Sequence, residues 1–445
     1  MRRNVYSVAI TTLAFAATLV LTVIAIPSAQ AQTLTVLHDF RGEQDGLYPN
    51  EGLTMDRAGH LYGVTLISDD YTNAGVVFSL VHQGSGWVFA TLHDFTQGDD
   101  GRYDDGYEPS SRLVIGPDGT FYGTTSNGNG GYGCPNYGCG VVFNLRPPAH
   151  ACVTALCPWT ETVLYRFTGS DDGGEPYGAL IFDEAGNIYG TTSVGGGGPC
   201  AGIGTMGCGV VFKLVPSNGG WTESVLYRFA GPPDGYCPES GVIFDQSGNL
   251  YGTTVDGGSS DGCDGAPCGT VFELSPSGSG WTENIIHTFQ GSDGDGPISG
   301  LIFDAQGNLY GATAYDIVPY NGGTVFMLTP SNGNWAYSQL YAWNDLGPGG
   351  TGPWDRLFMD AAGNLYGTTL TDGLYGYGSV FELTPGDGGW SYTSLHDFTG
   401  GDDGAKPEGN VIRDASGNLY GTTLNGGTSD LCMVEFCGVA FEITP

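Results

Sequence analysis

A ten-residue phrase that recurs along the chain is the feature that most limits what this chain can fold into. Residues 183–192 read DEAGNIYGTT. Four close copies begin at Asp245, Asp304, Asp360 and Asp414, and weaker copies begin at Asp56 and Pro117. Self-similarity at a near-constant spacing indicates a repeat architecture, in which each copy is one structural unit.

Each repeat contains four strand-like runs, which we call a, b, c and d. In the third repeat they read ALIFD, NIYGTT, GVVFKL and WTESVLYRF. The runs are short, rich in β-branched and aromatic residues, and bounded by Gly, Pro, Asn or Asp, which is typical of strands. A chain with 78 glycines that still has 12% aromatic residues suits many short strands joined by tight turns. The pattern predicts an all-β fold.

The two ends of the repeat region share one unit between them. Residues 34–40 (LTVLHDF) form a d run with no a, b or c before it, and residues 409–444 supply a, b and c with no d after them. Counted this way, the chain has seven runs of each kind. A ring explains the split, because the N-terminal strand then completes the last unit. We therefore predict a seven-bladed β-propeller with four-stranded blades, the last blade closed by the N-terminal strand.

The separated elements of the repeat follow one another in a fixed order: GNLYGTT, GG, G-VF-L-P, W, LY-F-G-DG and P. In this order the repeat resembles that of the GloVer tandem-repeat proteins, also called choice-of-anchor GloVer-containing proteins. The resemblance covers about residues 34–445 and implies an exported bacterial protein of unassigned activity. The D-x-x-G-N-L-Y core is also similar to NHL and lactonase-like propellers. No motif here matches the catalytic or metal-binding acids of those families, so no catalytic residue is assigned.

The N-terminus predicts a signal peptide over residues 1–31. Arg2 and Arg3 precede an apolar run over residues 8–26, and Ala29-Gln30-Ala31 forms an A-x-A cleavage signal. The single propeller domain then occupies residues 32–445, with a secreted, periplasmic or extracellular location and no transmembrane segment in the mature chain. An uncleaved membrane anchor is the alternative.

Cysteine spacing agrees with export. Ten of the eleven cysteines form close pairs: Cys134/Cys139, Cys152/Cys157, Cys200/Cys208, Cys263/Cys268 and Cys432/Cys437. Four of these pairs precede a c run, where local disulfides would close loops in an oxidising compartment. Zinc binding is the alternative, although no histidines cluster beside the pairs. Cys237 is left over.

The charge balance restricts the partners. With 47 acidic and 13 basic residues, the net charge of −34 would repel a phosphate backbone, so a nucleic-acid partner is excluded. Cations, basic proteins and neutral glycans fit this charge. We expect a monomer.

Antiparallel order places the b–c and d–a loops on one face of the propeller, which we call the b–c/d–a face. The d–a loops are acidic, and their carboxylates are hard ligands of the kind that Ca²⁺ prefers. The candidate calcium ligands are Asp99, Asp100, Asp171, Asp172, Asp293, Asp295, Asp402 and Asp403. Ordinary Asp-Gly turn chemistry is the alternative.

The b–c loops carry tyrosines among glycines, which suits binding of a glycan or a protein partner. The candidates are Tyr132, Tyr137, Tyr315, Tyr320, Tyr375 and Tyr377. Covering of loop backbone is the alternative. His38, His93 and His396 occupy a d-run position that carries tyrosine elsewhere, which indicates packing. The sequence favours a non-enzymatic binding scaffold that acts through the b–c/d–a face. The alternative is a polysaccharide-active lyase or hydrolase that uses the acidic d–a residues.

Overall fold

The computed structural model divides the chain into two compact units, Met1–Ala31 and Gln32–Pro445. It describes residues 32–42, 44–67, 73–84, 86–98, 102–128, 134, 138–148, 159–198, 200, 206–259, 263, 266–315, 322–343, 351–428 and 437–445. The predicted signal peptide lies outside these residues. Within them, no helix has the length and apolar character needed to cross a membrane.

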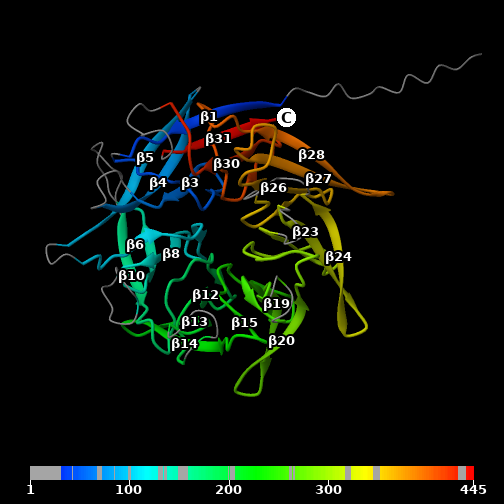
Figure 1. Cartoon of the computed structure of the whole chain (residues 1–445). Coiled ribbons are helices and arrows are strands. Elements are labelled where there is room, and N and C mark those ends of the chain that lie inside the picture. Colours follow the sequence, from blue (N-terminus) through cyan, green and yellow to red (C-terminus); the bar gives the residue numbers. More distant parts are fainter. Residues whose placement is uncertain are drawn as a thin grey trace, which may run out of the picture. The chain divides into compact units, whose positions relative to one another are not determined.

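Seven antiparallel blade sheets and one two-stranded sheet form the unit Gln32–Pro445, and Figure 1 shows the blades arranged in a ring. Blade 1 contains β2 (Thr54–Met55), β3 (Leu61–Thr65), β4 (Asn73–Gln83) and β5 (Gly86–Thr96), and blade 2 contains β7 (Val114–Ile115), β8 (Phe121–Asn127), β9 (Val141–Arg146) and β10 (Thr160–Arg166). Blade 3 contains β11 (Ile181–Phe182), β12 (Ile188–Thr192), β13 (Val210–Ser217) and β14 (Gly220–Arg228). Blade 4 contains β16 (Ile243–Phe244), β17 (Leu250–Thr254), β19 (Thr270–Ser277) and β20 (Gly280–Thr288).

The remaining blades repeat this order. Blade 5 contains β21 (Ile302–Phe303), β22 (Leu309–Thr313), β23 (Thr324–Ser331) and β24 (Asn334–Ala342), and blade 6 contains β25 (Phe358–Met359), β26 (Leu365–Thr369), β27 (Ser379–Gly386) and β28 (Gly389–Asp397). Blade 7 contains β29 (Ile412–Arg413), β30 (Leu419–Thr423), β31 (Val439–Thr444) and β1 (Thr33–Asp39). Three short strands lie outside the blade order: β6 (Tyr107–Pro109) pairs with β8, and β15 (Gly235–Tyr236) pairs with β18 (Asp256–Gly257).

The ring closes through its first strand, as the sequence predicts. The order within blade 7 is β1-β31-β30-β29, and β1 runs antiparallel to β31 from the pair Thr33/Thr444 to the pair Asp39/Val439. Figure 1 shows the two strands side by side. The seven-bladed, four-stranded architecture is therefore confirmed.

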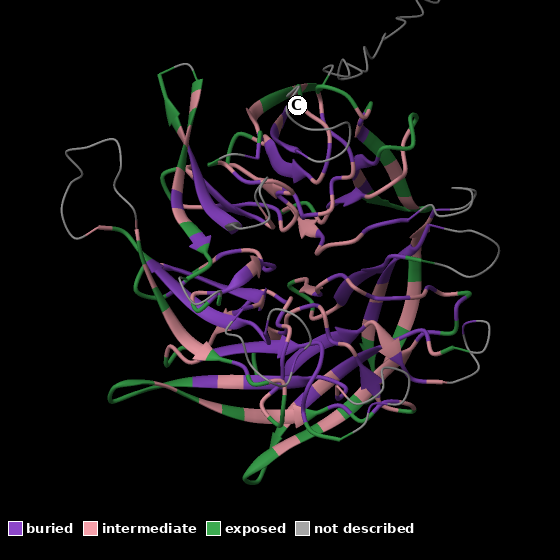
Figure 2. Cartoon of the chain, turned by 60° about the vertical axis from the view of Figure 1, so that its left-hand side comes forward, coloured by how far each residue is buried: buried purple, intermediate pink, exposed green. Residues whose placement is uncertain are grey.

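The core lies between neighbouring blades. Each pair of blades shares one apolar cluster, such as the one that joins Tyr189 of blade 3 to Leu250 and Phe272 of blade 4. A fully buried phenylalanine from each c strand fills these clusters: Phe78, Phe143, Phe212, Phe272, Phe326, Phe381 and Phe441. Figure 2 shows the buried residues along the strands and exposed residues at the tips of the outer hairpins.

The recurring phrase is structural throughout. In blade 3, Asp183 accepts hydrogen bonds from the backbone N–H groups of Ala185 (3.0 Å) and Asn187 (2.9 Å) and from the Tyr189 hydroxyl (3.0 Å). Gly186 has a φ of +81°, which a residue with a side chain rarely adopts. The phrase is thus the turn between strands a and b followed by strand b, as predicted.

The a run is shorter than its sequence indicates. ALIFD is five residues long, but only Ile181–Phe182 pair as β11. The same two-residue length recurs in every a strand. These strands are innermost, and the residues before them leave the sheet to line the centre of the ring.

Candidate functional site

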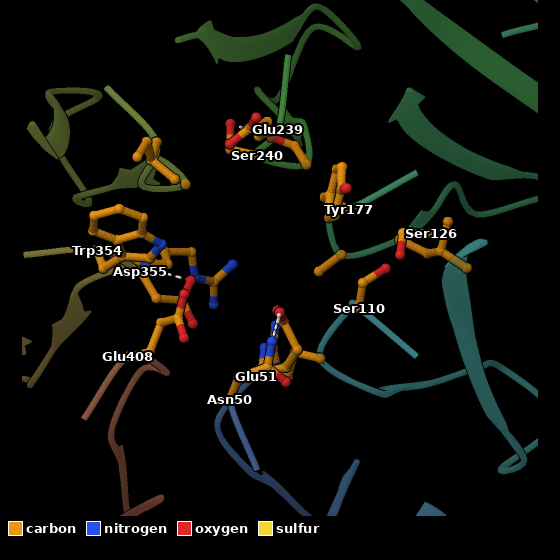
Figure 3. Close-up of a pocket in the computed structure, with 18 of the residues that line it drawn as sticks. Asn50, Glu51, Ser110, Ser126, Tyr177, Glu239, Ser240, Trp354, Asp355 and Glu408 are labelled. Carbon is orange, nitrogen blue, oxygen red and sulfur yellow. Dashed lines mark hydrogen bonds between the residues drawn. The ribbon is translucent and has the colours of Figure 1, made fainter. Parts of the chain in front are cut away.

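A cavity of about 460 Å³ lies where the d–a loops of the seven blades meet, and we call it the central pocket. In each d–a loop the last proline lies four residues before the first leucine or valine of the a run, at Pro49, Pro109, Pro176, Pro238, Pro297, Pro353 and Pro407. The residue after each proline lines the pocket: Asn50, Ser110, Tyr177, Glu239, Ile298, Trp354 and Glu408. Figure 3 shows six of these seven post-proline residues, with their labels, around one open centre.

The residue before six of the seven prolines has a positive φ angle, and in five of these six it is not a glycine. Positive φ angles occur at Tyr48 (59°), Glu108 (58°), Glu175 (55°), Cys237 (55°) and Lys406 (54°). Such angles are sterically disfavoured for residues other than glycine, and a following proline restricts the backbone further. Strained backbone of this kind clusters at functional sites when the surrounding structure holds it in place.

Backbone hydrogen bonds hold these pre-proline residues. In blade 3, the Glu175 N–H donates to the Cys139 carbonyl of blade 2 (2.9 Å), and the Glu175 carbonyl accepts from the Ser193 N–H (3.1 Å). Cys237 is held in the same way by the carbonyl of Cys208 (3.2 Å), and Gly296 by the carbonyl of Cys268 (3.2 Å). Blades 2, 3 and 4 therefore help to position the pocket-lining residues of blades 3, 4 and 5.

Disulfides brace the loops that make these contacts. The predicted bonds Cys134–Cys139, Cys200–Cys208 and Cys263–Cys268 are confirmed. Cys437 is also disulfide-bonded, whereas Cys432, Cys152 and Cys157 lie outside the described residues. Zinc is excluded at the three confirmed pairs, because their sulfurs are bonded to each other. Cys237 has a free thiol, and burial raises its pKa.

One side of the pocket combines two guanidinium groups with two carboxyls. Asp355 accepts hydrogen bonds from the backbone N–H groups of Asn410 (2.8 Å) and Arg356 (2.5 Å). Burial and the nearby Arg356 lower the pKa of Arg112 to about 10, although Asp355 and Glu51 oppose that shift. Burial and the charge of Asp355 raise the pKa of Glu51 well above its ordinary value.

Other carboxyls of the pocket titrate near neutrality. Burial, together with Asp256 and Glu175, raises the pKa of Glu239 to about 7. Burial and Asp355 raise the pKa of Glu408 to about 7. In Figure 3, Glu239 lies across the open centre from Glu51 and Glu408. The pocket therefore holds carboxyl groups that can be either charged or protonated near pH 7.

The predicted calcium ligands do not line this pocket where they are described. Asp172, Asp293 and Asp403 close their own loops: Asp172 accepts from the Tyr165 hydroxyl, and the other two pair with His287 and His396, each at 3.0 Å. One position of strand d carries histidine in some blades and tyrosine in others. These contacts agree with a packing role for the side chain at that position. Asp171 and Asp402 directly precede Asp172 and Asp403 in the sequence. Asp99 and Asp100 lie outside the described residues.

Asp295 differs from the other predicted calcium ligands, because it lies beside Tyr315 and a disulfide. Its backbone forms a bridge with Tyr315, and its carboxylate lies near the disulfide of Cys263 and Cys268. Among the described residues, these three form the one group whose ligand atoms lie within 4.8 Å of one another, and its two sulfurs are joined. Calcium binding by the d–a acids stays a prediction.

The predicted tyrosines fall into two groups. The Tyr315 ring meets Trp354 edge-on, with ring centroids 5.8 Å apart, so it supports a pocket residue from outside. Tyr375 and Tyr377 lie beside Leu374 on the b–c loop of blade 6, and these are exposed large side chains (54%, 46% and 76%). Tyr132, Tyr137 and Tyr320 lie outside the described residues. A ligand-binding role for these tyrosines stays a prediction.

Sequence reasoning identified the loops of this face but missed the residues that line its pocket. A signal for them was present in the repeat. The proline recurs in every d–a loop at a nearly fixed distance before the a run, while the next residue differs in all but two repeats. A constant frame around a changing position is the pattern expected of ligand-facing residues on a rigid scaffold.

The model of one protein family matches this chain over most of its length. The family is described as the Gloeobacter/Verrucomicrobia repeat, and its matches cover residues 22–198, 104–282 and 264–445. No curated protein matches the chain.

Several solved structures are similar in fold. A protein from Bacteroides uniformis described as a 6-phosphogluconolactonase is 14% identical, with a TM-score of 0.48 over 82% of this chain and 96% of its own. An ulvan lyase is 13% identical, with a TM-score of 0.46 over 87% and 92%. The aldose sugar dehydrogenase of Escherichia coli is 14% identical, with a TM-score of 0.42 over 93% and 99%. Scores below 0.5 carry no inference about activity.

Proposed function

The chain belongs to the Gloeobacter/Verrucomicrobia repeat family, and on that premise we propose that it is an exported protein that binds a glycan in its central pocket. The observation that carries this proposal is the convergence of the seven post-proline residues on one cavity. Six of the seven blades contribute a polar or aromatic side chain there, while the frame behind them repeats. Function in propellers belongs to such sites rather than to the fold.

The lining has the chemistry that glycans require. Trp354 offers a flat apolar surface for a sugar ring, and the carboxyl, amide and hydroxyl groups around it can hydrogen-bond to sugar hydroxyls. Asn50 Oδ1 and Arg356 Nε are buried and have no hydrogen-bond partner among the described residues. Buried polar atoms are normally paired, so a ligand that supplies partners for these two atoms would be favoured. The cavity volume also lies in the range of small-ligand pockets.

Export is supported by the disulfides and by the N-terminal segment. Three bonds close short loops on the same face as the pocket, and such bonds persist in oxidising compartments. The apolar segment and A-x-A triplet of residues 1–31 supply the targeting signal.

A glycan array with purified residues 32–445 tests this proposal, with and without Ca²⁺. We expect binding that Trp354→Ala abolishes at an unchanged melting temperature, because the pocket loses its aromatic surface. Tyr375→Ala serves as the matched variant on the exposed rim, and its loss of binding would place the ligand outside the pocket. Absence of binding to every glycan would refute the proposal.

A polysaccharide-active enzyme is the second candidate, and the acids Glu239 and Glu408 favour it. Their pKa values of about 7 suit proton transfer at neutral pH. Incubation of the bound glycan with the protein separates the two functions. Release of reducing or unsaturated sugar that Glu239→Gln abolishes would establish the enzyme, whereas intact glycan would support the binding protein.

A further inference from the structure

The central pocket has more acidic than basic groups. Its lining contains five carboxyls, from Glu51, Glu108, Glu239, Asp355 and Glu408, but only two guanidinium groups, from Arg112 and Arg356. Both arginines have acidic neighbours within the protein. Arg356 interacts with Asp355, and Arg112 interacts with Asp355 and Glu51.

Among the residues that the structure describes, no arginine pairs with the other three acids, Glu108, Glu239 and Glu408, and we call them the unmatched carboxyls. Glu108 accepts a hydrogen bond from the Asn127 side chain (2.6 Å), which carries no charge. The charged groups that act on Glu239 are the acids Asp256 and Glu175. Asp355 and Lys406 act on Glu408, and the acid has the larger effect.

Two aromatic rings face the same space. Tyr177 and Trp354 line the pocket and lie on opposite sides of its open centre in Figure 3. The face of such a ring attracts a cation, most strongly when water is excluded. Aromatic rings and carboxyls whose nearby charges are mainly acidic therefore select for the same kind of ligand, a cation.

We propose that the central pocket holds an amino-sugar oligosaccharide whose ammonium groups pair with the unmatched carboxyls Glu239 and Glu408 on the two sides of the cavity, while Trp354 and Tyr177 contact its sugar rings. This inference rests on the proposed glycan-binding function and names the class of glycan. The sugar rings meet the aromatic surface and the neutral polar groups, and the ammonium groups supply positive charge. A neutral sugar adds no positive charge to this acidic pocket, and a uronic acid adds a further negative charge, so both bind more weakly.

Titration calorimetry with three matched oligosaccharides tests the inference. The probes are glucosamine hexamers, N-acetylglucosamine hexamers and N,N,N-trimethylated glucosamine hexamers. We expect the two cationic probes to bind at least about tenfold more tightly than the acetylated one, since one ion pair with a desolvated acid has about that effect.

Two substitutions locate the effect. Glu239→Gln and Glu408→Gln preserve the shape of the side chain, and each should reduce affinity for the cationic hexamers about tenfold while leaving the acetylated hexamer unchanged. Glu283→Gln is the matched control, because burial also raises the pKa of Glu283 to about 7 but it lies on β20, outside the pocket lining. Loss of affinity in the Glu283 variant, or equal loss for all three probes, would overturn the inference.

The trimethylated probe also separates the charge of the protein from that of the ligand, because its own charge does not change with pH. Its affinity should rise between pH 6 and pH 8 as Glu239 and Glu408 ionise. A flat profile would overturn the inference.

The same titrations separate failure of this inference from failure of the proposed function. Equal affinity for acetylated and cationic hexamers overturns the amino-sugar inference alone, and glycan binding stands. Binding of a lysine hexapeptide as tight as that of the glucosamine hexamer shows that a cationic protein is the ligand, and it overturns the inference. Absence of glycan binding of any kind refutes both proposals.

Discussion

The backbone N–H of Glu175 donates a hydrogen bond to the carbonyl of Cys139 at 2.9 Å, across the junction of blades 2 and 3. Cys139 is fixed by its disulfide with Cys134, and Glu175 holds Pro176 and Tyr177 toward the central pocket. The equivalent contacts at Cys208 and Cys268 do the same for the next two blades. The disulfides thus stabilise the ring and the wall of its pocket at once.

Removal of one of these bonds should destabilise the fold and loosen the pocket. We expect the double variant Cys200→Ala/Cys208→Ala to lose about 2 kcal/mol of unfolding free energy, since the unfolded chain gains freedom when the loop opens. Urea denaturation measures this loss. Cys237→Ser is the control, because Cys237 has a free thiol, and a change of similar size there would contradict the assignment.

The closing strand should contribute strongly to stability. Phe40 follows β1 and is fully buried, so Phe40→Ala should cost about 3–5 kcal/mol, and deletion of residues 34–40 should cost more. Val36→Ala on the same strand serves as the control, since Val36 is 36% exposed. A melting temperature that stays unchanged in the deletion variant would show that the ring does not depend on β1.

The glycine in the recurring phrase is required by packing. A Cβ atom at Gly190 would lie 2.6 Å from Cζ of Phe212, so Gly190→Ala should destabilise the protein by about 1–3 kcal/mol. Phe212→Leu in the same chain should recover part of that loss by removing the atom that clashes. Gly388→Ala, at a turn position with open space around it, should change stability by less than about 0.5 kcal/mol. Chemical denaturation of the three variants checks this order.

Stability without ligand should fall as the pH rises from about 4.5 to about 7. Glu239 and Glu408 have folded-state pKa values of about 7 against an ordinary value of 4.5, so the folded state binds more protons than the unfolded state in this window. The unfolding free energy therefore decreases with pH there and levels off above it. Glu239→Gln should remove part of the slope and be more stable than the natural chain at pH 8, by up to about 2 kcal/mol.

Urea denaturation at a series of pH values measures this slope. Glu184→Gln is the control, because Glu184 is an exposed residue of an a–b turn. An identical pH profile for the natural chain and Glu239→Gln would contradict the burial argument.

The sequence alone was sufficient for the fold because the signals are local and repeated. The Asp183 turn, the buried strand that contains Gly190 and the alternation in strand d each follow from neighbouring residues. The d run at residues 34–40 has no a, b or c run before it. Counting it with the last repeat gives seven complete blades, which predicts the ring closure. The disulfides at Cys134, Cys200 and Cys263 followed from close spacing in the same way.

The pocket could not be derived in this manner. Glu239 and Glu408 are separated by more than two blades in the chain, and only ring closure brings them to one cavity. Their pKa values depend on burial and on acids such as Asp256 and Asp355, which the sequence does not place beside them. The d–a aspartates were more conspicuous in the sequence, but Asp172 and Asp403 close their own loops.

The sequence by itself determined the seven blades, their closure and the face that carries the variable loops, because hydrogen-bonded strands and turns depend on short-range patterns. The tertiary structure alone decided that the post-proline residues meet and that Glu239 and Glu408 are desolvated there. Solvation and charge depend on distances between blades, and those distances exist only once the ring is formed.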